Sequence, residues 1–379
     1  MKNKKILFVI PSFFQGGGNR SLCSLLPFLK DNRFEFSIYC LNPIGSFKDS
    51  YKEYNVIKTS FFMSLFSRVF FRKLLKLFRI LLHVHVEKIV YYLECNFNKN
   101  LNSFDTVIAF QEDSPTHFAC FLKGRKIAWM HSDMQLHYDN LDIPFQWDVN
   151  SYKCYDKIVC VSKSIVETFL RFIPDVNDRI TYLYNVIDVN NVRYLSMEQT
   201  QSPFIEEGSF SIVSVGRICD VKRFDKIPFI VKKIKDLRPN LKLRWYIIGP
   251  LNSLSEQIQI DIDKLGLSDS IILLGEKKNP YPYIKKSNLL ACISYSESWS
   301  YVLNEALTLH VPVLSTDFSA AYEVIPEGLG IICRYEDLCN QIIDIVQNKN
   351  NIYTDMRARC LSFEYSNHDI IKKFYELMQ

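Results

Sequence analysis

Glycine is scarce in this chain, which has only 12 glycines among 379 residues. Its 11 cysteines form none of the Cys-x-x-Cys pairs that are typical of structural zinc sites, which argues against a zinc module. No apolar run approaches the roughly 18 residues that a transmembrane helix needs. The first residues reach a glycine cluster after one short apolar run, unlike a signal peptide. We therefore expect reduced thiols and a cytoplasmic location.

The composition is that of a globular protein, with 48% hydrophobic and 23% charged residues, and the length suits two domains. The net charge is +5, and the excess of basic residues lies in the first half. Such an excess indicates an anionic partner. Because many of these basic residues cluster in one aromatic-rich segment, a membrane surface is favoured over nucleic acid, and we expect no nucleic-acid partner.

That segment comprises residues 61–93, in which basic residues alternate with Phe, Leu and Ile at helical spacing. The basic residues are Arg68, Arg72, Lys73, Lys76 and Arg79. The pattern predicts a basic amphipathic helix that contacts anionic lipid headgroups. A core-packed helix with a solvated basic face is the alternative interpretation.

The first half alternates short buried strands with helices, beginning with a strand at residues 5–11 and a helix from about residue 19. Gly16, Gly17 and Gly18 lie between them, and the missing Cβ atoms let a ligand approach the backbone closely. The cluster does not match Gly-x-Gly-x-x-Gly, which argues against a dinucleotide cofactor. Ser162 is predicted to cap a following helix.

The stretch before residue 208 is polar and contains Pro203, so we place the domain boundary near 190–208. A second series of strands and helices follows. The predicted fold is α/β, with two doubly wound Rossmann-like domains that face a central cleft. The predicted domains are residues 1–190 and 205–365, and residues 366–379 form a helix that returns to the first domain.

Residues 289–316 predict one strand–helix–strand unit of a parallel sheet. Glu297 lies in the turn before the helix and Glu305 lies within it. The start of such a helix attracts an anion, whereas carboxylates prefer neutral hydroxyls. A nucleotide sugar, with a phosphate group between two hydroxyl-rich ends, suits both. The alternative is that the helix dipole alone favours Glu297 and that Glu305 is a solvated surface residue.

Arg217 and Lys222 follow the first strand of the second domain, and parallel strands bring their carboxyl ends to the same edge of the sheet. Two cations there could bind a diphosphate and neutralise its charge as it leaves. Alone, the two residues could equally be ordinary surface cations.

Taken together, these motifs resemble those of the retaining glycosyltransferases of family four, which have the GT-B fold. The resemblance extends over essentially the whole chain, is of the bacterial surface-polysaccharide type, and rests on a set of residues in the family order. They are Gly16-Gly17-Gly18, His131, Ser162, Asn185-Val186-Ile187-Asp188, Gly216-Arg217 with Lys222, Gly249, Gly275, Glu297 seven residues before Glu305-Ala306, and Pro312-Val313.

The resemblance implies a role for each of the four charged residues named above in the second domain. Glu305 would accept hydrogen bonds from the ribose of the nucleotide, and Arg217 and Lys222 would hold the donor diphosphate. Glu297 would lie beside the donor sugar and help to stabilise positive charge at its anomeric carbon.

It also implies backbone contacts to the donor. Gly17 and Gly18 would close over the phosphate from the first domain, and His131 would reach the sugar; a histidine after a strand is otherwise often a packing residue. Backbone N–H groups of the turn and helix start would contact sugar and phosphate; these belong to Ser298, Trp299, Ser300, Tyr301 and Val302.

The implied reaction is a front-face transfer in which the leaving phosphate oxygen takes the proton of the acceptor, so neither a dedicated base nor a metal is required. The resemblance implies no cofactor, and the nucleotide-diphosphate sugar is the donor substrate. A lipid-linked or oligosaccharide acceptor of polysaccharide or lipopolysaccharide biosynthesis would be met at the inner face of the cell membrane, where the basic segment would attach the protein peripherally.

The chain departs from its relatives at the turn, where Ser298-Trp299-Ser300 replaces the common Gly-Phe-Gly. This substitution leaves the donor sugar open, and Trp299 could either contact the donor or fill the core. Leu251 replaces a frequent glycine and leaves the nucleobase open. Two other functions stay open: a sugar-nucleotide epimerase, and a catalytically silent subunit that supports a partner transferase.

Overall fold

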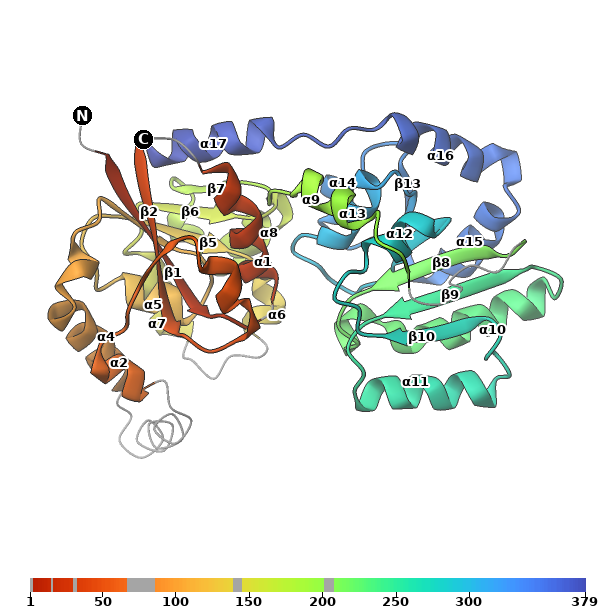
Figure 1. Cartoon of the computed structure of the whole chain (residues 1–379), viewed down its shortest axis with the longest axis horizontal. Helices are drawn as coiled ribbons and strands as arrows, with labels where there is room; N and C mark the ends of the chain where they lie inside the picture. Colours follow the sequence, from red (N-terminus) through yellow and green to blue (C-terminus); the bar gives the residue numbers. More distant parts are fainter. Residues whose placement is uncertain (1–2, 15, 30–32, 67–85, 139–144, 201–207) are drawn as a thin grey trace. The chain divides into compact units, whose positions relative to one another are not determined.

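The computed structural model describes residues 3–14, 16–29, 33–66, 86–138, 145–200 and 208–379. The chain divides into two compact units (Figure 1). Unit 1 comprises Met1–Val186 with His368–Gln379, and unit 2 comprises Ile187–Asn367. Each unit is described here by itself.

Unit 1 is built on a parallel sheet of seven strands in the order β3-β2-β1-β4-β5-β6-β7. Strand β1, which lies inside the sheet between β2 and β4, contains an uninterrupted apolar run from Ile6 to Ile10 whose side chains are all buried, as expected for a strand covered on both faces. The strands are β1 (Lys4–Ser12), β2 (Phe34–Asn42), β3 (Asn55–Ile57), β4 (Thr106–Ala109), β5 (Arg125–Met130), β6 (Lys157–Cys160) and β7 (Ile180–Tyr182).

The helices of unit 1 follow most of these strands. Ser162 caps one of them as predicted, because its hydroxyl accepts a hydrogen bond of 3.3 Å from the N–H of Ile165. The helices are α1 (Gly17–Leu25), α2 (Phe61–Phe66), α4 (Val86–Phe97), α5 (Ser114–Ala119), α6 (Met134–Tyr138), α7 (Phe145–Tyr152), α8 (Lys163–Phe172) and α17 (His368–Met378).

Unit 2 is built on a parallel sheet of six strands in the order β10-β9-β8-β11-β12-β13. The strands are β8 (Phe210–Val215), β9 (Leu243–Ile248), β10 (Ile271–Gly275), β11 (Leu289–Cys292), β12 (Val313–Thr316) and β13 (Gly330–Cys333). The helices are α9 (Val189–Leu195), α10 (Ile227–Leu237), α11 (Ser253–Lys264), α12 (Tyr281–Lys286), α13 (Tyr301–Thr308), α14 (Ala321–Val324), α15 (Leu338–Val346) and α16 (Ile352–Ser362).

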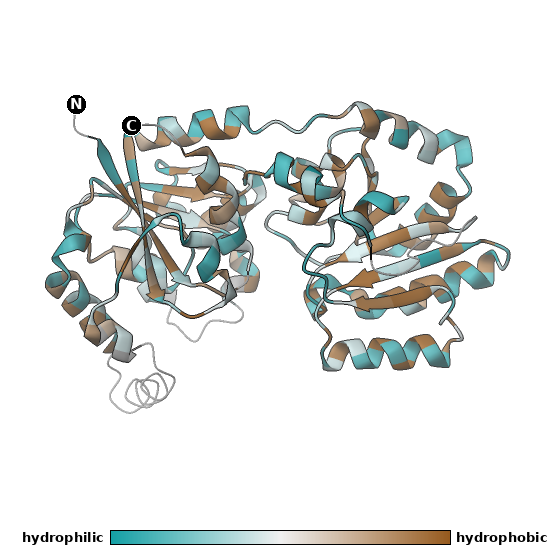
Figure 2. Ribbon diagram, viewed as in Figure 1, coloured by the Kyte–Doolittle hydropathy of each residue, from teal (hydrophilic) through white to brown (hydrophobic). Residues whose placement is uncertain are grey.

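One hydrophobic core of unit 2 lies between its sheet and the helices α10, α11 and α15. Trp245 on the sheet, Val231 on α10 and Ile342 on α15 are among its fully buried members. Figure 2 shows β10 brown (hydrophobic) along most of its length, whereas α11 is teal (hydrophilic) along much of its length. Helices α9, α12 and α13 contact one another in a second group. The prediction of two parallel-sheet α/β domains is confirmed.

The chain passes from unit 1 to unit 2 at Val186, before the polar stretch that suggested a boundary near 190–208. Helix α9 explains the difference, because it contacts α12 and α13 of unit 2. Its Arg193 donates a hydrogen bond of 3.3 Å to the carbonyl of Thr308 and forms an ion pair of 2.7 Å with Glu364.

The last helix, α17, belongs to unit 1. Phe374 on this helix is completely buried and its ring lies 6.1 Å from that of Trp129 on β5. The side chain of Arg125 donates a hydrogen bond of 2.7 Å to the carbonyl of Leu377. The end of the chain therefore completes the core of the first unit.

The segment 61–93 is described only at its two ends, as α2 and as part of α4, and its five singled-out basic residues lie outside the described residues. The predicted amphipathic helix stays a prediction. Among the described helices, none has the length and apolar character needed to cross a bilayer.

Candidate active site

Three glycines close the carboxyl ends of three neighbouring strands of unit 2. The N–H of Gly216 after β8 donates to the carbonyl of Ile248 at 3.0 Å, and the N–H of Gly249 after β9 donates to the carbonyl of Gly275 at 3.1 Å. A Cβ atom on Gly249 would lie 2.1 Å from the carbonyl oxygen of Gly216. Only glycine allows these backbones to come so close, and the loops diverge from this point.

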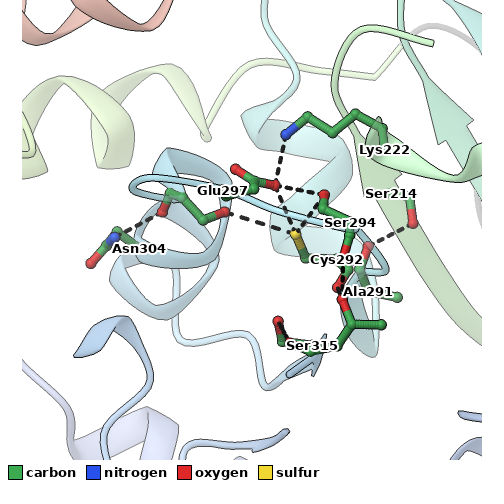
Figure 3. A network of polar contacts seen from close by, with 10 residues as sticks. Ser214, Lys222, Ala291, Cys292, Ser294, Glu297, Asn304 and Ser315 are labelled. Atoms are coloured by element: carbon green, nitrogen blue, oxygen red, sulfur yellow. Dashed lines mark hydrogen bonds and ion pairs between the residues drawn. The ribbon is translucent and has the colours of Figure 1, made fainter. Parts of the chain in front are cut away.

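Lys222 forms an ion pair with Glu297 beside these strand ends (Figure 3). The distance from Nζ to Oε1 is 2.7 Å. The methylene groups of the lysine extend over Gly216, whose Cβ would lie 3.5 Å from the lysine Cε. The two loops are also joined by a backbone hydrogen bond of 2.7 Å from the N–H of Tyr295 to the carbonyl of Val221. Two residues predicted separately to be functional thus lie in direct contact.

Glu297 is held in place by two further donors from the end of β11. The hydroxyl of Ser294 donates to Oε1 at 2.7 Å, and the thiol of Cys292 donates to the same oxygen at 3.1 Å. The contacts from Lys222, Ser294 and Cys292 all reach Oε1. Burial and, to a smaller extent, the Glu297 carboxylate raise the pKa of Cys292 to about 12, so this residue is a neutral thiol donor.

Both members of the ion pair are charged. Burial would lower the pKa of Lys222, but the Glu297 carboxylate outweighs burial and the pKa is raised. Burial would raise the pKa of Glu297, but Lys222 and the hydrogen bonds from Ser294 and Cys292 outweigh burial and lower it. The lysine side chain is 22% exposed and can still present donors to a ligand.

Arg217 lies on the same loop and is exposed. Its guanidinium makes no hydrogen bond or ion pair with the described residues, in contrast to Lys222. The loop therefore carries two different cations. Lys222 is held by a carboxylate, whereas the planar guanidinium of Arg217 is exposed and can bind an anion.

Helix α13 begins after Ser300 without a side-chain cap on its first N–H groups. Ser300 is completely buried, and its carbonyl accepts a hydrogen bond of 2.8 Å from the side chain of Asn304. Trp299 is 8% exposed, whereas Ser298, Tyr301 and Val302 are partly exposed. Of the backbone N–H groups predicted to meet a phosphate, those of Tyr301 and Val302 start this uncapped helix, which is favourable for an anion, and the others precede it.

Glu305 is 3% exposed and is therefore not a solvated surface residue. The hydroxyl of Tyr281 at the start of α12 donates to its Oε1 at 3.1 Å. A buried carboxylate needs hydrogen-bond donors, and the Tyr281 hydroxyl is one of them.

The remaining predicted residues lie in unit 1. Helix α1 begins at Gly17, where a Cβ atom would meet nothing within 4 Å, whereas a Cβ on Gly18 would lie 2.5 Å from the side chain of Gln111. His131 follows β5 and its ring lies 5.0 Å from that of Phe110. Burial lowers the pKa of His131 to about 3, so the ring is neutral, and its Nε2 has no hydrogen-bond partner among the described residues.

Glu112 is a residue that the sequence motifs did not single out. It is 5% exposed, and one of its carboxylate oxygens accepts hydrogen bonds from the backbone N–H groups of both His131 and Ser132. Glu112 therefore fixes the backbone that carries His131. Its position just after the buried strand at residues 105–110 could have indicated a functional role, because ligands bind at the carboxyl ends of parallel strands.

Within the described ranges, no group of three or more His, Cys, Asp and Glu side chains is placed to hold a metal ion. Asp261 and Asp263 lie on helix α11. Each accepts a hydrogen bond from a glutamine one turn earlier, at 3.2 Å from Gln257 and 3.0 Å from Gln259.

Comparison with known proteins gives this site a context. Residues 196–361 match the family model described as glycosyl transferases group 1, and this range lies inside unit 2. An uncharacterized glycosyltransferase of Methanocaldococcus jannaschii is 30% identical over 174 residues, which are 44% of this chain and 41% of the relative. Residues 196–361 of unit 2 therefore resemble a group 1 glycosyltransferase domain. All predicted site residues except Gly17, Gly18 and His131 lie in this matched range.

A second relative is the N-acetylgalactosamine-N,N'-diacetylbacillosaminyl-diphospho-undecaprenol 4-alpha-N-acetylgalactosaminyltransferase of Campylobacter jejuni, 30% identical over 166 residues. These residues are 44% of this chain and 42% of that enzyme, so the chain spans less than half the length of both curated relatives. The crystal structure of Anabaena Alr3699/HepE in complex with UDP has a TM-score of 0.72, with 14% identity over 99% of both chains. The two chains therefore share the GT-B fold.

We expect Gly249→Ala to damage the fold of unit 2, because the new Cβ atom would collide with the carbonyl oxygen of Gly216. A backbone oxygen cannot move aside as a flexible side chain can. We expect a loss of several kcal/mol in stability, within the range for overpacked interiors. The matched control is Gly266→Ala, at φ +65 with nothing within 4 Å of the new Cβ, which should cost only about 1 kcal/mol. Thermal unfolding of both variants measures the difference, and equal losses would contradict the proposed close contact.

The ion pair predicts a pH-dependent effect of Lys222→Met. In the wild-type protein, the stabilisation from Glu297 is lost only as pH falls through its lowered pKa, and that from Lys222 only as pH rises through its raised pKa. The pair therefore contributes steadily between about pH 5 and about pH 10. The variant leaves Glu297 buried without its cation, which should cost about 3 kcal/mol at neutral pH. Protonation of Glu297 should reduce this loss as the pH falls.

The measurement is thermal unfolding at pH 7.5 and pH 5.5. Lys232→Met, which removes an exposed ion pair with Asp236, is the control and should cost less than about 1 kcal/mol at both values. A loss in Lys222→Met that does not change with pH would refute the assignment of charges.

Proposed function

We propose that this chain is a retaining glycosyltransferase that moves a sugar from a nucleotide-diphosphate sugar to a lipid-linked glycan acceptor. The observation that carries the proposal is the Lys222–Glu297 ion pair, which lies at converging strand ends within residues 196–361, the range that matches the group 1 glycosyl transferases. Arg217 lies on the same loop, and the uncapped start of α13 follows Glu297 by a few residues. In this proposal the cations and the helix start bind the diphosphate of the donor, Glu305 binds its ribose, and Glu297 lies beside its sugar.

In this proposal the cations act on the leaving group. Charge develops on the diphosphate as the bond to the sugar breaks, and Arg217 and Lys222 are placed to neutralise it. They would supply the positive charge that a metal ion supplies in other transferases, so we propose that no metal is required. Glu297, which is ionised and fixed through Oε1, would stabilise positive charge at the anomeric carbon. Glu305 would bind the ribose.

Retention of configuration would follow from attack on the face that the leaving group occupies. The leaving phosphate oxygen would then accept the proton of the acceptor hydroxyl, and no separate base is needed. His131, with a neutral ring, suits a hydrogen bond to a sugar hydroxyl rather than proton abstraction. Closure of the donor site would exclude water and prevent hydrolysis.

The acceptor is proposed from a relative and from the sequence. The name of the Campylobacter relative includes a sugar linked to diphospho-undecaprenol. The basic segment 61–93 would hold the chain at an anionic membrane surface, where such acceptors are found. We propose a role in polysaccharide, capsule or lipopolysaccharide biosynthesis, with the protein in the cytoplasm and peripherally bound to the inner membrane face.

The donor site is tested by thermal unfolding against UDP, GDP, ADP and dTDP and their sugars, in the presence of a chelator. A ligand that binds only the folded protein raises its melting temperature, by an amount equivalent to about 2.7 kcal/mol at 100 times Kd. We expect a shift with one nucleotide, and its loss in Glu305→Gln, which removes the carboxylate charge but keeps the shape. The exposed Glu327→Gln is the control and should retain the shift. No shift with any nucleotide would favour the silent subunit.

Membrane association is tested separately by sedimentation with vesicles that contain anionic lipid. Reversing the charges at Arg72, Lys73 and Lys76 should release the protein, because each basic residue near an anionic surface contributes about 1 kcal/mol. The matched control reverses Lys232, Lys233 and Lys235 on α10 and should leave binding unchanged. Equal binding by both triple variants would assign segment 61–93 to the protein core instead.

A further inference from the structure

Arg223, the residue after Lys222, has a left-handed backbone at φ 54 and ψ 26. It joins two single turns of 3-10 helix, Asp220–Lys222 and Phe224–Lys226, and its carbonyl accepts a hydrogen bond of 3.0 Å from the N–H of Lys226. A residue other than glycine loses roughly 1–2 kcal/mol in this conformation. Because the backbone changes direction at Arg223, this residue affects the direction in which the side chain of the preceding Lys222 points.

The side chain of Arg223 lies over two aromatic rings. Its Cζ is 4.8 Å from the ring centroid of Tyr295 and 4.9 Å from that of Tyr335. Tyr295 follows β11 two residues before Glu297, and Tyr335 starts a 3-10 turn after β13. Each cation–π contact contributes about 0.5–1 kcal/mol at an exposed site, so the two together can offset the backbone strain.

The contact with Tyr295 joins the loops that carry the two halves of the ion pair, and the contact with Tyr335 attaches Arg223 to the loop after β13. The N–H of Tyr295 also donates at 2.7 Å to the carbonyl of Val221, next to Lys222. The Lys222 side chain is long and flexible, and its position depends on how its loop is held against the Glu297 loop. Removing the Arg223 contacts should loosen this arrangement without removing any ligand-binding group.

We propose that Arg223 is a positioning residue, which holds Lys222 against Glu297 through Tyr295 and Tyr335 and so prepares the lysine for a diphosphate. This inference rests on the proposed function. It assigns a role to a strained residue and to two tyrosines that none of the motifs includes. Arg223 itself is not proposed to contact the ligand.

The decisive variant is Arg223→Gly, because glycine adopts the left-handed conformation without strain. The relieved strain should balance the lost contacts, so we expect a melting temperature within about 3 °C of the wild type. The Kd for the nucleoside diphosphate should nevertheless rise about threefold to tenfold, the equivalent of one or two cation–π contacts. The probe is whichever of UDP, GDP, ADP and dTDP stabilises the wild-type protein.

Asn350→Gly is the matched control, because Asn350 has φ 50 and ψ 33 and lies in the connection between α15 and α16. It should leave the Kd unchanged. Arg223→Lys keeps a cation and should recover part of the lost affinity. Tyr335→Phe keeps the ring and should bind like the wild type, whereas Tyr335→Leu should bind more weakly.

The outcomes separate the two proposals. If none of the four nucleotides stabilises the wild-type protein, the proposed function fails. If the wild type binds and Arg223→Gly binds equally well at an unchanged melting temperature, the positioning role fails. If Arg223→Gly instead unfolds at a much lower temperature, Tyr335→Leu and Tyr335→Phe decide, and equal affinities in these two variants would also overturn the positioning role.

Discussion

The ion pair between Lys222 and Glu297 is the interaction on which the candidate site depends. Neither residue could remain charged beside the sheet without the other, because each has lost much of its contact with water. The pair forms only because glycines let the strand ends approach and because parallel strands bring both loops to one edge. The rest of the site is arranged around it: the uncapped helix start, the exposed Arg217, and Glu305 with Tyr281.

Apolar runs predicted the central strands well, because strands buried on both faces must be apolar throughout. The edge strands β3 and β13 were missed. They have three and four residues, and every residue of β13 is only partly buried, so neither leaves a long apolar run. Helix α9 was missed as well, and this displaced the expected boundary from the point where the chain changes units.

The site was predicted at the level of residues but not of contacts. Strand ends and glycines indicate which side chains reach the same edge of a sheet, and in this way Lys222, Glu297 and Arg217 could be chosen. They do not indicate that Lys222 and Glu297 bind each other, because that contact joins residues 75 positions apart and depends on side-chain direction. Glu112 accepts hydrogen bonds from backbone N–H groups, and Arg223 has a left-handed backbone. Both roles depend on backbone geometry, which no sequence motif records.

The path of the chain between its units has a consequence for folding during synthesis. The first and last residues of unit 2, Ile187 and Asn367, are hydrogen-bonded to each other. The side chain of Asn367 accepts a hydrogen bond of 3.1 Å from the N–H of Ile187 and donates one of 2.7 Å to its carbonyl. Unit 2 is therefore an insertion whose ends meet. The buried Phe374 and Met378 of α17 belong to unit 1 but follow unit 2 in the chain, so they are translated after it. The inserted unit can complete its core while the first unit still lacks its closing helix.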